Sequence, residues 1–270
     1  MTQAGKIHIG VGGWTFEPWR GVFYPDGLRQ KDDLAYMAGK LTAIEINSTY
    51  YGSQKPETFA SWAAQVPDGF IFSVKGSRFC TNRRALKDGA ESIARFMGQG
   101  ISELGDRLGP LLWQLAPTKR FDAADFEDFL NLLPDALSGR SLRHCVEVRH
   151  DSFCTPEFPA LLRKHGMACV YADHGIYPEI ADVTGPFVYA RLQTGSDDIA
   201  TAYSAADLDG WAGRLKTWAG GGEPADLPRV DPEHSPAVTP RDVFAFIIHE
   251  GKVRAPHGAM ALIERTDNLG

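Results

Sequence analysis

The segment Val243–His249 (VFAFIIH) has six consecutive apolar residues before it ends on a histidine. Most other segments rich in β-branched and aromatic residues are similarly continuous, without alternation of apolar and polar positions. They are Ile7–Val11, Ala43–Asn47, Phe70–Lys75, Pro110–Leu115, His144–Arg149, Ala168–Asp173 and Phe187–Leu192. Continuous apolar runs are typical of parallel strands that are covered on the outside. The pattern therefore predicts eight parallel strands.

Helical periodicity separates most of these strands. The predicted helices are Lys31–Lys40, Pro56–Gln65, Ala90–Leu108, Ala123–Leu133, Pro156–His165, Ser204–Ala219 and a short Gly258–Arg265. After the sixth strand only a weak helical pattern is found, around Tyr177–Asp182. Eight strands, each followed by a helix or its remnant, within 270 residues predict an α/β fold, the (β/α)8 TIM barrel, as one domain over residues 1–270.

A doubly wound open sheet is the alternative architecture. Such a sheet usually has a glycine-rich turn of the form G-x-G-x-x-G after its first strand. Gly10 and Gly12 match the first two positions here, but Thr15 occupies the final glycine position. The barrel is therefore the preferred fold.

One segment, residues 220–242, breaks the alternation of strands and helices. It begins with three consecutive glycines and carries prolines at positions 224, 228, 232, 236 and 240. Proline at every fourth residue forbids both a helix and a central strand. The segment is predicted to be an irregular Pro/Gly-rich loop inserted before strand eight, either a tolerated surface insertion or a lid.

Composition excludes several classes of protein. The net charge is −6, and hydrophobic residues make up 43% of the chain. These values exclude intrinsic disorder and small disulfide scaffolds, and the acidic balance argues against bulk nucleic-acid binding. The longest apolar run has six residues, far short of the ~20 that cross a bilayer. We expect no signal peptide, four reduced cysteines and a cytoplasmic location.

Polar residues gather where the predicted strands end, which is where TIM barrels carry their chemistry. They are Trp14, Glu45, Asn47, Lys75, Gln114, Glu147, Arg149, His150, Asp173, Arg191 and His249. Successive side chains of a strand point to opposite faces, so Glu45 shares a face with Asn47, and Glu147 shares one with Arg149. Any single pair of these charges is also open to a purely structural ion pair. Taken as a set, they predict a functional site at the barrel mouth.

Aromatic residues are dense after the first two strands. Core packing over the barrel top accounts for several of them. Trp14 and Tyr50 or Tyr51 are the better candidates for a stacking wall, because indole and phenol rings combine an apolar face with a polar edge. Sugars and other ring-shaped ligands suit such a wall.

Several motifs together resemble the YecE-like family, a domain of unknown function (DUF72). They are GVGGW from Gly10, EINSTYY from Glu45, PDGFIFSVK from Pro67, Gln114-Leu115, EVRH from Glu147, and Asp173. The resemblance covers essentially the whole chain and implies a TIM-barrel fold. It implies no activity. The chain departs from the family pattern at Gln193, where the family typically has histidine, and at His249-Glu250, where an asparagine pair is typical.

The leading functional hypothesis is a metal-independent enzyme that acts on a small anionic or sugar-like substrate at the barrel mouth, as a hydrolase, isomerase or lyase. Glu45 and Glu147 are the acid/base candidates, since two carboxyls in different environments can be tuned to opposite protonation states. Lys75 is the third catalytic candidate, as an anion-binding group or a Schiff-base nucleophile. The predicted substrate-binding residues are Trp14, Asn47, Tyr50, Gln114, Arg149, His150, Asp173, Arg191 and His249.

Arg149 is the expected main anchor of the anion, and neither a metal ion nor a cofactor is expected. Two other classes of function stay open. The first is a metal-dependent barrel like the sugar isomerases and endonucleases, with Glu45, Glu147, Asp173 and His249 as ligands. The cations Lys75, Arg149 and Arg191 argue against this class, because they would lie close to the metal ion and repel it. The second is a ligand-binding protein without catalytic activity.

Overall fold

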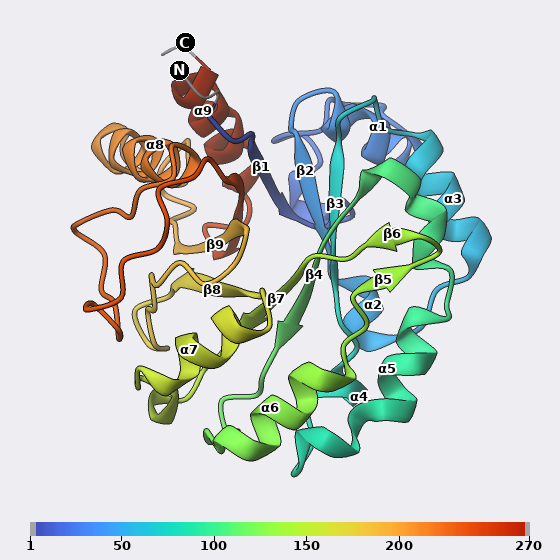
Figure 1. Ribbon diagram of the computed structural model, residues 1–270. Helices are drawn as coiled ribbons and strands as arrows, with labels where there is room; N and C mark the ends of the chain where they lie inside the picture. Colours follow the sequence, from blue (N-terminus) through green and yellow to red (C-terminus); the bar gives the residue numbers. More distant parts are fainter. Residues whose placement is uncertain (1–3, 268–270) are drawn as a thin grey trace.

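The strands predicted from continuous apolar runs form a closed parallel barrel in the computed structural model, which describes residues 4–267 apart from the side chain of His249 (Figure 1). Its strands, in the order in which they pair, are β1 Ile7–Gly12, β10 Asp242–Glu250, β9 Phe187–Thr194, β8 Ala168–Asp173, β7 His144–Glu147, β4 Leu108–Gln114, β3 Ile71–Lys75 and β2 Ala43–Ile46. The predicted (β/α)8 architecture is confirmed, and the open sheet is excluded.

Alternate residues of each strand point into the barrel. On β9, Phe187 and Tyr189 belong to the apolar cluster inside the barrel, whereas Val188 and Ala190 belong to the outer core under the helices. The same alternation holds on β10, where Phe244 packs inside with Phe187. Polar residues in register with the inward set therefore meet inside the mouth.

Helices cover the outside of the barrel, as Figure 1 shows. They are α1 Asp33–Ala38, α2 Ser48–Tyr51, α3 Pro56–Ala64, α4 Arg78–Thr81, α5 Ala90–Met97, α6 Ala123–Leu132, α7 Glu157–Lys164, α8 Ala205–Ala219 and α9 Ala255–Asp267. Short 3-10 segments are Glu17–Trp19, Gln30–Asp32, Leu86–Gly89, Ile101–Arg107 and Asp151–Phe153. The side chains of Asp122 and Ser204 cap the amino ends of α6 and α8.

The structure corrects the prediction of one long helix over Ala90–Leu108. Helix α5 ends at Met97, and Gly100 follows with a φ of 101°, which favours glycine and breaks the helix. The 3-10 turn Ile101–Arg107 then leads into β4, which begins at Leu108, two residues earlier than predicted.

Three smaller features of the structure also differ from the prediction. No helix forms over residues 177–182, because this stretch runs on without regular structure. A two-residue hairpin, β5 Ala136–Leu137 with β6 Arg140–Ser141, was not predicted, and strands this short leave no pattern in the sequence. The last helix, α9, extends beyond the predicted Gly258–Arg265 at both ends.

The Pro/Gly-rich segment 220–242 has no regular structure before β10, as predicted, and lies beside α8 in orange-red in Figure 1. The backbone amides of Val230 and Asp231 donate hydrogen bonds to the carboxylate of Asp182 at 2.8 and 3.0 Å. Asp231 also pairs with Arg163 on α7. The segment, described over its whole length, contributes no residue to the cavity at the barrel mouth.

Among the described residues, no helix is both long and apolar enough to cross a membrane. All four cysteines are free, and Cys80, Cys145 and Cys169 are buried. Cys154 is exposed, because it lies in the turn after β7 and not in a strand.

Candidate functional site at the barrel mouth

Inward-pointing polar residues of the strands form a layer between the apolar interior and the carboxyl end of the barrel. Eight of them are buried: Glu45, Ser73, Lys75, Gln114, Glu147, Tyr189, Arg191 and Gln193. Above them lies a cavity of about 600 Å³. Its polar lining residues are Asn47, Tyr50, Tyr51, Lys75, Gln114, Arg149, Arg191, Gln193, Glu250 and Lys252. The volume is in the range of pockets for small molecules.

Arg191 is the centre of this layer. Its Nε and Nη2 donate to the two carboxylate oxygens of Glu45 at 3.1 and 3.0 Å, and its Nη1 donates to Oε2 of Glu147 at 2.5 Å. Both carboxylates have no exposed surface, and Arg191 is 5% exposed. One guanidinium thus binds both buried carboxylates, which its planar set of donors allows and a lysine does not.

The carboxylate oxygens of Glu45 and Glu147 also accept hydrogen bonds from other side chains. Glu45 accepts hydrogen bonds from Asn47 Nδ2 at 3.0 Å and from the Tyr189 hydroxyl at 2.8 Å. Glu147 accepts from Gln114 Nε2 at 2.9 Å and from Arg149 Nε at 2.7 Å. The two carboxylates are therefore fully engaged by the protein itself.

This environment keeps both carboxyls ionised. Burial opposes ionisation, but Arg191 and Lys75 outweigh it and lower the pKa of Glu45. Burial is likewise outweighed by Arg191 and Arg149 at Glu147, whose pKa falls to about 2. The expectation that the two carboxyls are tuned to opposite protonation states is therefore wrong, because the same guanidinium stabilises the charged form of each.

Lys75 is a cation of the site that forms no direct ion pair among the described residues, although the charges of Glu45 and Glu147 act on it at longer range. Its side chain lines the cavity and is 7% exposed, and its Nζ lies 4.3 Å from the centre of the Tyr50 ring. No carboxylate of the described residues lies within 4.0 Å of this Nζ. Burial, followed by the charge of Arg191, lowers the pKa of Lys75 to about 8.

Gln193 carries a buried amide without a partner. The side chain is 2% exposed and lines the cavity, yet Nε2 has no hydrogen bond among the described residues. An unmatched buried donor costs about 1–3 kcal/mol. Such a group at a cavity is poised to bind an acceptor atom of a ligand.

Glu45 and Glu147 lie behind the cavity lining, and three further predicted site residues, Trp14, His150 and Asp173, are not part of it. Trp14 packs edge-on against Trp62. His150 accepts a hydrogen bond from the backbone amide of Ser152 at 3.1 Å, capping the turn that follows. Asp173 is on the outward register of β8 and accepts from the Thr194 hydroxyl at 2.5 Å. His249 is in β10, but its side chain is outside the described residues.

Some residues of the site were not predicted from the sequence. Ser73, Tyr189 and Gln193 belong to the same inward registers as Lys75 and Arg191, so two-residue periodicity was the signal that could have identified them. Lys252 lies after β10 in a turn, and no periodic pattern reaches it.

Three of the four donor groups expected for a metal are engaged in other contacts, and the side chain of the fourth, His249, is outside the described residues. Glu45 and Glu147 bind Arg191, and Asp173 binds Thr194. Within the part of the chain whose side chains are described, no three His, Cys, Asp or Glu residues gather as a metal site. The residues present do not fit the predicted metal-dependent alternative, because a guanidinium occupies the position between the carboxylates.

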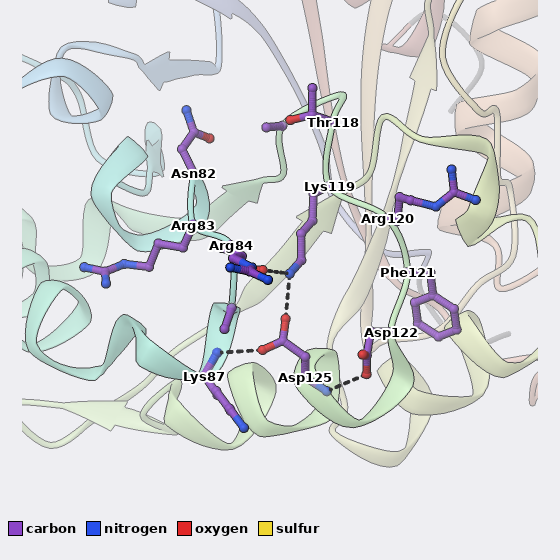
Figure 2. A pocket seen from close by; sticks show the side chains of 12 residues that line it. Asn82, Arg83, Arg84, Lys87, Thr118, Lys119, Arg120, Phe121, Asp122 and Asp125 are labelled. Atoms are coloured by element: carbon purple, nitrogen blue, oxygen red, sulfur yellow. Dashed lines mark hydrogen bonds and ion pairs between the residues drawn. The ribbon is translucent and has the colours of Figure 1, made fainter.

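A larger cavity, of about 900 Å³, lies beside the α6 amino end and contains five basic residues (Figure 2). Two of its largely buried charges, Lys119 and Asp125, form an ion pair. Lys119 Nζ contacts Asp125 at 2.6 Å and the Arg84 carbonyl at 2.8 Å. Arg83 and Arg120 point away from one another in Figure 2. The charges do not converge on one ligand position, so the barrel mouth is the better candidate site.

Comparisons with known proteins agree with this architecture. Residues 8–269 match the model of a family described as a protein of unknown function, DUF72. The UPF0759 protein YecE of Escherichia coli K12 is 28% identical over 147 residues, which cover 54% of this chain and 50% of that protein. The chain thus spans about half the length of the curated relatives it matches.

Solved structures show the same fold. A DUF72 family protein from Thermotoga maritima superposes with a TM-score of 0.66 at 22% identity, covering 96% of this chain and 97% of the other. One from Enterococcus faecalis gives 0.69 at 15% identity, covering 98% and 99%. A fusion of a xylose isomerase-like TIM barrel with a 4-hydroxyphenylpyruvate dioxygenase gives 0.53 at 14% identity, covering 97% and 43%. By its match over nearly the whole length, the chain belongs to the DUF72 family.

Proposed function

We propose that the protein is a metal-independent enzyme that acts on a small anionic substrate at the barrel mouth. The observation that carries this proposal is Lys75, a largely buried cation that lines the cavity and has no carboxylate of the described residues within 4.0 Å of its Nζ. Burying a charge without a counterion is costly. A protein retains such a group where a ligand supplies the missing charge, and active sites are the usual place for it.

The charge balance around the cavity favours an anion. Four lining residues are cations, Lys75, Arg149, Arg191 and Lys252, and Glu250 is the lining carboxylate. The two buried glutamates behind the lining compensate Arg191, and Glu147 also accepts a hydrogen bond from Nε of Arg149. A carboxylate or phosphate of a ligand at the mouth would neutralise the remaining positive charge.

Arg149 is suited to grip that anion. Glu147 holds its Nε at 2.7 Å, and the guanidinium lies over the Tyr177 ring with Cζ 4.7 Å from the ring centre. Its two terminal nitrogens make none of the hydrogen bonds found among the described residues. A guanidinium fixed on one edge can present its other edge to two oxygens of an anion.

Lys75 replaces the two glutamates as the acid/base candidate. A general acid or base works best when its pKa is near the working pH. The pKa of Lys75 is lowered to about 8, whereas that of Glu147 falls to about 2. In this proposal Glu45 and Glu147 position Arg191 and Arg149, and Lys75 transfers the proton.

The test is a thermal-denaturation titration with phosphate, sulfate and small carboxylates at constant ionic strength. A ligand that binds the native state raises the melting temperature in a saturable way. We expect saturation in the wild type and a response at least tenfold weaker in Arg149→Lys, which cannot form the paired contact. Arg95→Lys, at an exposed helical pair, is the matched control and responds like the wild type.

Two outcomes would contradict the proposal. If no anion stabilises the wild type, the mouth is not an anion site. If Arg149→Lys and the wild type respond equally, Arg149 is not the anchor. Saturable binding without turnover of any compound in a panel of anionic substrates would instead indicate a binding protein.

A further inference from the structure

We propose that Lys75 forms a Schiff base with the carbonyl group of a small aldehyde or ketone that also carries a carboxylate or phosphate. This inference rests on the proposed function, since it places an anionic substrate at the same mouth. It adds the reacting group of the substrate and the covalent role of one residue.

The position of Lys75 suits a nucleophile. It is the last residue of β3, where its backbone is held by pairing with Leu112 of β4 and by a hydrogen bond of 2.7 Å from the Thr49 hydroxyl to its carbonyl oxygen. Its stem is buried and its side chain lines the cavity. The amine is therefore presented to the cavity from a rigid strand end.

The surroundings of Lys75 differ from those of a structural lysine. Lys119, which is also largely buried, contacts Asp125 at 2.6 Å and a backbone carbonyl at 2.8 Å. Lys75 Nζ has neither kind of contact among the described residues and lies against the Tyr50 ring. An ion pair keeps an amine protonated, whereas burial beside other cations releases its proton.

A neutral amine is what attack on a carbonyl needs. Burial and the nearby guanidinium of Arg191 lower the pKa of Lys75 to about 8. About a tenth of the side chains are then neutral at pH 7, against roughly one in several thousand for an ordinary lysine. Desolvation and a neighbouring cation are the known means of activating a lysine for Schiff-base chemistry.

The step balances without an external oxidant or reductant. The nitrogen lone pair forms a bond to the carbonyl carbon, and the carbonyl oxygen takes up a proton to give a carbinolamine. The carbon–oxygen bond then breaks with a second proton, and the oxygen leaves as water. One of these protons comes from the amine and the other from solvent in the open cavity, and the product is a protonated imine.

The cavity also defines the class of substrate. The terminal nitrogens of Arg149 are available for an anionic group, and the unpartnered amide of Gln193 is available for an acceptor such as a hydroxyl or carbonyl oxygen. The volume of about 600 Å³ admits a small substrate of this kind. A carbonyl compound with an attached anion therefore matches the groups of the site.

Reductive trapping tests the inference. The wild-type protein is incubated at pH 8 with pyruvate, glyoxylate or dihydroxyacetone phosphate and sodium cyanoborohydride, and adducts are located by intact mass and peptide mapping. We expect one adduct per chain, on Lys75, with at least one probe. Pyruvate and glyoxylate represent carboxylate substrates, and dihydroxyacetone phosphate represents phosphorylated ones.

Controls separate a reactive site from general lysine labelling. Lys75→Arg is expected to lose the adduct, and Lys119→Arg is expected to keep it, because Lys119 lies in the other cavity. Lys252 lines the same cavity and serves as an internal comparison within each peptide map. The trapping rate is expected to rise about tenfold between pH 7 and pH 9, following deprotonation of Lys75.

The inference is overturned if none of the three probes gives an adduct on Lys75, or if labelling is spread evenly over surface lysines. Peptide mapping of the wild type decides this even if Lys75→Arg does not fold. If phosphate still stabilises the wild type through Arg149, the Schiff base alone is wrong and the anion site stands. If there is neither an adduct on Lys75 nor stabilisation by an anion, both proposals fail.

Discussion

Arg191 on β9 and Glu45 on β2 meet inside the barrel through two hydrogen bonds of 3.0 and 3.1 Å. Strands β10 and β1 separate them in the barrel wall, so the contact spans the interior and not a pair of neighbouring strands. Glu147 completes the arrangement from β7. Because buried charges are tolerated only when paired, this relationship explains how three charged side chains lie in the core of the mouth.

Removing Arg191 is expected to destabilise the fold strongly. Arg191→Met leaves two carboxylates buried without their shared cation, and breaking a buried pair in this way costs about 3–5 kcal/mol. Guanidinium denaturation at pH 7 measures the loss. Arg95→Met is the control, because its pair with Glu91 is exposed, and it should cost less than about 1 kcal/mol. Equal losses in the two variants would contradict the central role of Arg191.

Glu147 is expected to make stability dependent on acid pH. Its pKa is lowered from 4.5 to about 2, so its stabilising contribution is complete above pH 4.5 and is lost as the pH falls toward 2. The shift corresponds to on the order of 3 kcal/mol. Glu147→Gln is therefore less stable than the wild type at pH 7, and the gap closes between pH 4.5 and 2. Glu91→Gln is the control, because Glu91 is exposed. If the difference in unfolding free energy between Glu91→Gln and the wild type changed as much over this pH range, the pH dependence would not come from Glu147.

Lys75 is expected to lower the stability of the protein at neutral pH. Its pKa is lowered from 10.5 to about 8, so between these values the unfolded chain binds more protons than the native one, and stability rises with pH. Lys75→Met removes a penalty that is complete below pH 8 and absent above pH 10.5. We expect a gain of about 1–3 kcal/mol at pH 7, measured by urea denaturation.

Lys119→Met is the matched control for this variant. It leaves the carboxylate of Asp125 without its ion pair and is expected to lower stability. A loss of stability in Lys75→Met similar to that in Lys119→Met would show that Lys75 has a structural role and would weaken both proposals for the mouth.

Gln193 is expected to be dispensable for folding. Its Nε2 has no partner among the described residues, so Gln193→Leu should be neutral or stabilising by up to about 1 kcal/mol. Gln99→Leu is the comparison, because the Gln99 amide both donates to the Phe96 carbonyl and accepts from the Gln54 amide, each at 2.9 Å. Calorimetric melting temperatures distinguish the two. If Gln193→Leu lost as much stability as Gln99→Leu, the amide would have a structural partner.

Tightly bound divalent metal is not expected in the purified protein. The positions that a metal would take between Glu45 and Glu147 are filled by the guanidinium of Arg191. Elemental analysis of protein prepared without chelator checks this, and removal of trace metal should leave the melting temperature unchanged. Stoichiometric zinc or manganese would overturn the metal-independent proposal.

The sequence was sufficient to predict the barrel. Eight mostly continuous apolar runs, separated by helical periodicity, predict parallel strands covered outside by helices, and the missing glycine-rich turn after the first strand favours the closed barrel over an open sheet. The helix predicted over Ala90–Leu108 was too long because periodicity continued through Gly98 and Gly100, where the backbone turns. Patterns of apolar residues locate elements well and their ends poorly.

The sequence also placed most of the charged groups at the mouth, because they follow the strands at a fixed end. It could not decide what each group does. Strand register puts Asp173 on the outer face of β8, and contacts between residues 45, 147 and 191 turn two expected acid/base groups into partners of one guanidinium. Lys75 differs from them because no carboxylate of the described residues lies within 4.0 Å of its Nζ. Periodicity is a property of neighbouring residues in the chain, whereas pairing and pKa depend on distances between strands that only the closed barrel brings together.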